Sequence, residues 1–216
     1  MRTRAWWPVV LLGLAGCEGL TPPDRGIGYE YRHSTGIVFH WPADRLPVRY
    51  WIAPNSGDAA RWITAGIVTW RGQLLYGEFD GILVSDSASA DVIVVVEPGP
   101  PPDGIVNDLP PEPNACRGVT SFDVTPDFTQ MTGALVIELR WDSRFATDDI
   151  VNCLYRVAIH EVGHTLGIFA HSSVTGDLMA PVPIVRDPTL NDRQTVERLY
   201  HTPPDVRPHT SEPVVP

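Results

Sequence analysis

The residues best suited to chemistry are two histidines four positions apart, His160 and His164, in the segment His-Glu-Val-Gly-His. Side chains four apart on a helix lie one above the other on the same face, so both imidazoles can reach one zinc ion. Glu161 stands beside the first histidine, where its carboxylate can take a proton from water that the metal activates. The segment therefore predicts a zinc site that activates water, with Glu161 as the general base.

An open catalytic zinc site needs a third protein ligand, and the sequence that follows offers one. Gly167 can end the helix in a left-handed conformation and turn the chain back on itself. His171 comes next, and Met179 lies eight residues beyond it.

With these residues the sequence resembles the metzincins, closest to their matrixin-like branch. The signature of that family is His-Glu-x-x-His-x-x-Gly-x-x-His, followed by a methionine turn beneath the metal. The resemblance implies that His160, His164 and His171 bind one Zn²⁺, that Glu161 is the base and that Met179 is the turn methionine. It also implies a zinc endopeptidase that acts on protein or peptide substrates.

The sequence departs from the signature at one point. Three residues (168–170) separate Gly167 from His171, where the family has two, and Ala170, which cannot bind metal, stands at the regular ligand position. Two alternatives follow. Either the turn bulges and brings His171 back to the metal, or a carboxylate such as Glu197 completes a His-His-Glu site. We expect the bulge.

The resemblance further implies an edge strand above the zinc that pairs with extended substrate. Residues 117–122 occupy that place, which makes Gly118, Val119 and Thr120 the expected substrate-binding residues. Residues 181–184 would form the wall of a pocket beyond the scissile bond.

The elements that must position these residues can be read from hydrophobic spacing. Ile63, Ile67, Trp70 and Leu74 fall on one helix face, and the unbroken apolar run 92–96 is typical of a central strand. Asn191 is the expected cap of a last helix, with Gln194 three residues on. We predict an α+β fold: a metzincin-like twisted mixed sheet of about five strands, a long helix, an active-site helix and a C-terminal helix. The expected strands are 46–52, 81–85, 91–96, 117–124 and 133–140, and the expected helices are 58–76, 148–165 and 191–200.

Length and composition support one domain of moderate size. The chain has 216 residues, 43% of them hydrophobic, and a net charge of −10 with no lysine among its 16 basic residues. Such an acidic protein lacks the clustered cations that neutralise phosphates, so we expect no nucleic-acid partner. We expect a monomer.

The start of the chain predicts export. Two arginines precede a short apolar run, as in a secretory signal peptide over residues 1–16. The run ends in Leu-Ala-Gly-Cys, which resembles the lipobox of bacterial lipoproteins and implies that Cys17 carries a lipid anchor. We therefore expect residues 17–45 to be a lipidated tether at a bacterial membrane, with the outer membrane or cell surface favoured.

The predicted peptidase domain spans residues 46–202, and the five prolines of 203–216 predict a disordered tail.

In an oxidising compartment Cys116 and Cys153 would form a disulfide, although two buried thiols are the alternative. Three acids of a proline-rich loop could bind structural Ca²⁺, or the loop could simply be solvated. These acids are Asp103, Asp108 and Glu112.

Two classes of function remain open from the sequence. The first is a membrane-anchored zinc endopeptidase. The second is a non-catalytic lipoprotein that binds peptide or protein on a metzincin scaffold, with zinc in a structural role. The presence of Glu161 favours the first, because a structural zinc site has no use for a base.

Overall fold

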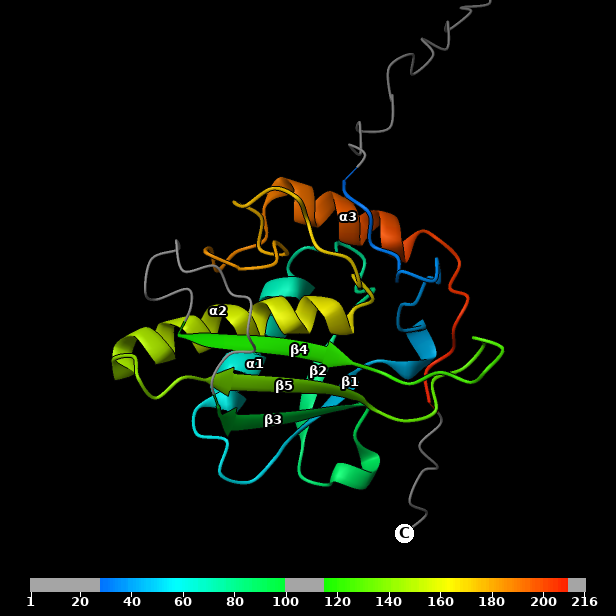
Figure 1. Ribbon diagram of the computed structural model, residues 1–216. Helices are drawn as coiled ribbons and strands as arrows, with labels where there is room; N and C mark the ends of the chain where they lie inside the picture. The colour runs from blue at the N-terminus through cyan, green and yellow to red at the C-terminus, as the bar shows by residue number, and fades with distance from the viewer. Residues whose placement is uncertain (1–27, 100–114, 210–216) are drawn as a thin grey trace, which may run out of the picture.

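The computed structural model describes residues 28–99 and 115–209 and contains an α+β fold built on one mixed sheet (Figure 1). None of the helices in these two ranges is both long and apolar enough to cross a membrane. The elements in chain order are β1 Val48–Ile52, α1 Ala59–Arg71, β2 Gly81–Val84, β3 Val92–Pro98, β4 Cys116–Ser121, β5 Leu135–Trp141, α2 Thr147–Thr165 and α3 Leu190–Tyr200, with 3-10 turns at Ala43–Arg45 and Ser87–Ser89.

The sheet has the order β2-β1-β3-β5-β4, with β4 antiparallel to its neighbour and all other pairs parallel. Strand β3 lies in the middle of the sheet, and both of its edges are paired inside the domain. Its unbroken apolar run is buried on one face only, because Val92 and Val94 are buried whereas Ile93 and Val95, on the opposite face, are half-buried. Among the residues that the structure describes, strand β4 lies at an edge of the sheet and pairs only with β5. The predicted fold class is confirmed.

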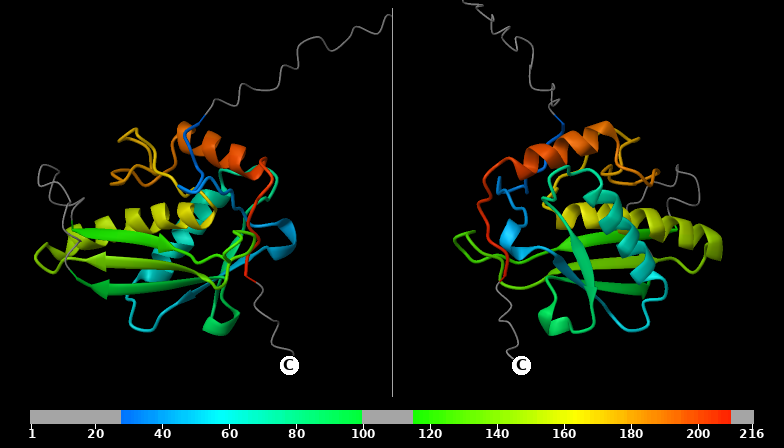
Figure 2. Two further views of the ribbon diagram at one scale, coloured as in Figure 1. Left: turned by 45° about the vertical axis from the view of Figure 1, so that its right-hand side comes forward. Right: turned by 180° about the vertical axis from the view of Figure 1, so that it is seen from behind.

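Helices α1 and α2 both contact the sheet. Helices α1 and α2 pack against each other, and α2 also contacts β4 and β5. In α1 the side chains of Ile63, Ile67 and Trp70 are buried, as predicted from their spacing. Helix α3 lies beyond α2, away from the sheet, in all three views (Figures 1 and 2).

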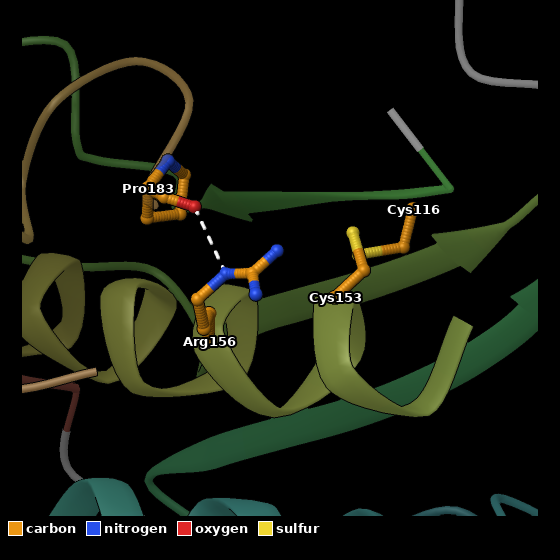
Figure 3. The surroundings of a disulfide bond; sticks show 4 residues. All are labelled: Cys116, Cys153, Arg156 and Pro183. Atoms are coloured by element: carbon orange, nitrogen blue, oxygen red, sulfur yellow. Dashed lines mark hydrogen bonds between the residues drawn. A yellow bond between two sulfur atoms is a disulfide. The ribbon is translucent and has the colours of Figure 1, made fainter. Parts of the chain in front are cut away.

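A disulfide joins the sheet to helix α2. Cys116, the first residue of β4, is bonded to Cys153 in α2 (Figure 3). The two residues are 37 positions apart in sequence. The bond therefore fixes the edge strand to the helix that carries the histidine motif.

The folded domain starts earlier than the predicted limit at residue 46. Tyr31, Phe39 and Trp41 belong to the expected tether, yet none of these side chains is more than 2% exposed. The indole of Trp41 donates to the carbonyl of Thr165 at the end of α2 (2.8 Å). Its described part, residues 28–45, has no regular secondary structure except one 3-10 turn, so periodicity could not reveal that it is part of the core.

The folded domain also ends later than the predicted limit at residue 202. Val206 is buried, and the main chain of Asp205 donates to the carbonyl of Val38 (2.9 Å). The carboxylate of Asp205 in turn accepts from the amide of Val38 (2.9 Å). The described part of the predicted tail is therefore paired with the N-terminal segment. Because residues 203–209 are rich in proline and charged side chains, nothing in their sequence indicates that Val206 is buried in the core.

These contacts make a prediction about truncation. Removal of 203–216 should lower the free energy of unfolding by about 2 kcal/mol, because Val206 loses its buried site and Val38 its partner. Removal of 210–216 alone is the matched control and should leave stability unchanged. Urea denaturation of the three forms measures both effects, and equal midpoints for all three would show that the segment contributes nothing.

Candidate metal centre

Three histidines converge at one end of α2. His160 and His164 lie one turn apart in the helix and are buried, whereas His171 comes from the following turn and is exposed. The Nε2 atoms of His160 and His164 are 3.0 Å apart, and those of His164 and His171 are 3.2 Å apart. Within the described residues this is the group of side chains able to hold a metal ion.

The hydrogen bonds of the imidazoles show that these nitrogens suit a cation. Nδ1 of His160 lies 2.8 Å from the carbonyl of Leu178, and Nδ1 of His164 faces the carbonyl of Ile168. A carbonyl only accepts, so both Nδ1 atoms carry the proton and both Nε2 atoms present lone pairs to each other. Two nitrogen ligands of a tetrahedral zinc ion lie about 3.3 Å apart, which matches these separations. The three histidines therefore fit Zn²⁺.

Burial keeps the two helical histidines in the neutral form that binds metal. It lowers the pKa of His164 to about 4, with a further contribution from His171. It also lowers the pKa of His160 well below the ordinary value, and the neighbouring His164 adds to this shift. The pKa of His171 is lowered as well, because neighbouring atoms partly shield its imidazole from water although the residue as a whole is exposed. Both shifts in α2 favour the imidazole with a free lone pair.

The extra residue before His171 is accommodated in a bulged turn. Gly167 has a φ of 105°, and a Cβ at this position would lie 1.8 Å from the carbonyl oxygen of Phe39. The amide of Phe169 then donates to the carbonyl of Tyr31 (2.8 Å). The N-terminal segment thus holds the longer turn, and His171 returns to the other two histidines.

Met179 lies beneath the helix, and the turn around it is held by α3. Its side chain is fully buried, with the sulfur packed against the backbone of Gly163, where a Cβ would approach it to 2.5 Å. The buried carboxylate of Asp192 accepts from the amides of Leu178 (2.8 Å) and Met179 (3.2 Å). The carbonyl of Leu178 accepts the hydrogen bond from Nδ1 of His160, and it belongs to the same peptide unit as the amide of Met179. Asp192 therefore fixes the peptide unit that orients the imidazole of His160.

The sequence analysis did not identify Asp192. It placed the cap of α3 at Asn191, whereas the cap is Thr189, in a capping box with Asp192. The signal was present as Thr-x-x-Asp before the helix, with Asp in place of the usual Glu. Asn191 instead donates to the carboxylate of Asp177 (2.6 Å).

Asp177 is a second carboxylate under the turn that the sequence analysis missed. It accepts hydrogen bonds from the hydroxyls of Ser172 (2.5 Å) and Thr189 (2.6 Å). Burial alone would raise its pKa, but these hydrogen bonds together with that of Asn191 lower it. Residues 172–179 are thereby closed into a loop, in which the amide of Ser172 also donates to the carbonyl of Met179 (2.8 Å).

Glu161 is buried on the side of α2 that faces strand β4. Burial raises the pKa of its carboxyl group to about 7, although the hydroxyl of Thr120 and the charge of Arg117 act in the opposite direction. Such a group can both accept and donate a proton near neutral pH.

Comparison with known proteins identifies the segment that carries this site. Residues 103–201, just under half of the chain, match the family model Matrixin, and the range includes the three histidines, Glu161 and Met179. The resemblance to the matrixins is confirmed. Among solved structures, the chain is similar to High choriolytic enzyme 1, a hatching enzyme zinc-protease from Oryzias latipes (medaka fish). That match has 12% identity and a TM-score of 0.41, and it covers 81% of this chain and 98% of the other. No curated protein sequence matches the chain.

The matrixin-like site opens into a cavity of about 700 Å³. Strand β4 from Cys116 to Ser121 forms one side, and Pro181, Val182 and Pro183 form part of another. The side chain of Arg156 donates to the carbonyl of Pro183 (3.2 Å) and so connects α2 to this second wall (Figure 3). The predicted substrate-binding residues Gly118, Val119 and Thr120 all line the cavity beside the histidines.

The other predicted site residues lie elsewhere. Glu197, the alternative zinc ligand, accepts from Arg193 on α3 (2.9 Å) and is not part of the histidine group. Cys17 and the acids considered for Ca²⁺ are outside the described residues. These acids are Asp103, Asp108 and Glu112.

The lowered pKa values predict how zinc affinity depends on pH. An imidazole with a pKa of 6.5 becomes about tenfold less available as a ligand between pH 7.5 and 5.5, so three such ligands would cost about a thousandfold. With His160 and His164 still neutral at pH 5.5, the dissociation constant for zinc should rise by less than about tenfold. Competition with a chromophoric chelator at both pH values measures this ratio, with circular dichroism to show that the protein stays folded. A thousandfold rise would mean that the histidines titrate as in free peptides.

Proposed function

We propose that this protein is a zinc-dependent endopeptidase that hydrolyses peptide bonds in extended protein or peptide substrates. The observation that carries the proposal is the position of Glu161, a buried carboxylate that lines the same cavity as the three histidines. Three protein ligands leave one position of a tetrahedral zinc ion open, as catalytic sites require. The matrixin match over residues 103–201 supports the same chemistry.

Strand β4 is the part of the chain suited to bind the substrate. It lies at the edge of the sheet, pairs only with β5 and lines the cavity. A peptide added to a free strand edge is held mainly by main-chain hydrogen bonds, which tolerate many side chains. This mode of binding suits an endopeptidase that acts on extended segments.

Two groups would share the work of hydrolysis, the metal ion and the carboxylate of Glu161. The three histidines would hold a zinc ion, which would act as a Lewis acid that polarises the carbonyl and lowers the pKa of water. Glu161 takes the proton that water loses as its oxygen bonds to the carbonyl carbon. The same carboxyl group returns a proton to the amine as the carbon–nitrogen bond breaks. Burial raises the pKa of Glu161 above its ordinary value, which makes the carboxylate a stronger base than an exposed glutamate.

This assignment predicts the effect of Glu161→Gln. The variant keeps the size of the side chain but cannot accept the proton, so hydrolysis of an unfolded protein should fall by about 10² to 10⁴-fold. Zinc content should stay at about one ion per chain, because Glu161 is not a ligand. Mass spectrometry of the products and metal analysis of the same samples test both parts.

Glu197→Gln is the matched control. It makes the same chemical change on α3, and activity and zinc content should both remain at the level of the unaltered protein. If the unaltered protein binds zinc and cleaves nothing, the non-catalytic binding function replaces the proposal. If Glu197→Gln loses zinc, the third ligand is the carboxylate and not His171.

We also propose that the enzyme is exported and held at a bacterial membrane by a lipid on Cys17. The basic start, the apolar run and the Leu-Ala-Gly-Cys sequence support this location. Acyl chains anchor a protein through buried methylene groups, while the domain itself stays in water.

The anchor predicts a result for Cys17→Ser. Cells that express the unaltered chain and are fed radioactive palmitate should label it, and the labelled protein should sediment with membranes. The serine variant should carry no label and should leave the membrane fraction. Equal labelling of both forms would place the lipid on another residue.

A further inference from the structure

The carboxylate of Glu161 lies across strand β4, next to Gly118 and Thr120. These two residues are two positions apart, so they lie on the same face of the strand. Helix α2 and β4 are in direct contact along this face.

Gly118 provides the space in which the carboxylate lies. A Cβ at this position would be 2.3 Å from Oε1 of Glu161 and 2.6 Å from its carboxyl carbon. Both separations are well below van der Waals contact, and the neighbouring atoms are the reactive end of the side chain. Any residue larger than glycine at position 118 would therefore displace the carboxylate from its present place.

Thr120 holds the other oxygen of the same carboxylate. Its hydroxyl donates to Oε2 of Glu161 (2.7 Å), and the same hydroxyl lies 3.3 Å from the main-chain oxygen of Glu161. A hydrogen bond to a charged acceptor is stronger and more directional than one between neutral groups. One hydroxyl proton occupies one acceptor site of Oε2, which leaves the other sites of the carboxylate available.

Two further features keep strand and helix at a constant separation. The disulfide links Cys116, two residues before Gly118, to Cys153 of α2. Strand β4 is also paired with β5 from Cys116 to Ser121 without interruption. The hydroxyl of Thr120 therefore presents a fixed donor to a side chain on a fixed helix.

We propose that Thr120 and Gly118 are positioning residues for Glu161, which is an inference that rests on the proposed peptidase function. Thr120 orients the carboxylate through Oε2, and Gly118 leaves the space that Oε1 needs. Together they hold the base so that its remaining lone pairs can receive the proton of the water. Strand β4 would then orient the base as well as bind the substrate.

The test compares Thr120→Val with Thr120→Ser. Valine keeps the shape and removes the hydroxyl, so kcat should fall between about tenfold and a hundredfold, while KM and zinc content stay unchanged and Tm falls by no more than a few degrees. Serine keeps the hydroxyl and should restore kcat to within about twofold of the unaltered protein. Thr64→Val is the matched control, because it removes an exposed threonine hydroxyl on α1 that bonds only to Ala60 of its own helix.

The outcomes separate this inference from the proposed function. An unaltered protein that cleaves, with Thr120→Val within twofold of it, would overturn the positioning role and leave the peptidase intact. Equal losses in the valine and serine variants, or a rise in KM alone, would assign Thr120 to substrate binding and also overturn it. Gly118→Ala gives an independent readout: if it folds and binds zinc, its kcat should fall and its KM should not. An unaltered protein with no activity would reject the peptidase itself.

Discussion

The metal site depends on two hydrogen bonds that fix the imidazoles of α2. The main-chain carbonyls of Leu178 and Ile168 accept hydrogen bonds from the Nδ1 atoms of His160 and His164. The Nε2 atoms of the two rings, 3.0 Å apart, therefore each carry a free lone pair. A helix alone places the two rings on one face but does not choose their tautomers. The tautomers are fixed by carbonyl groups in two loops that follow α2. Both loops must therefore fold back onto the helix before both Nε2 atoms are free to bind a metal ion.

Each of these loops is held by a part of the chain far from the motif. The carboxylate of Asp192 on α3 binds the amides on either side of the carbonyl of Leu178, while Phe39 and Tyr31 of the N-terminal segment contact the turn at 167–169. The indole of Trp41 reaches the end of α2 in the same way. Segments with no regular structure thus serve as supports of the site, which is why they are buried.

The sequence predicted the fold class and most of its elements because their signals are local. The spacing of the buried residues of α1, the apolar run of β3 and the histidine step in α2 each follow one periodicity. The residues that hold the loops of the metal site, such as Asp192 and Phe39, do not follow any such periodic spacing. No role for Asp192 follows from the sequence, because the cap was expected at Asn191, and Phe39 falls in the predicted tether. Their roles arise from pairings between distant segments, which a single sequence does not display.

The pairing of the N-terminal segment with residues 165–206 has a consequence for when the site can form during synthesis. The hydrogen bonds between Trp41 and Thr165 and between Val38 and Asp205 join residues 124 and 167 positions apart. Contacts of such separation form late, because a long stretch of chain must be ordered before they close. A chain that ends between His171 and Asp192 contains all three histidines but lacks the carboxylate that holds the turn around Met179. The metal centre therefore has all of these supports only when nearly the whole chain is present.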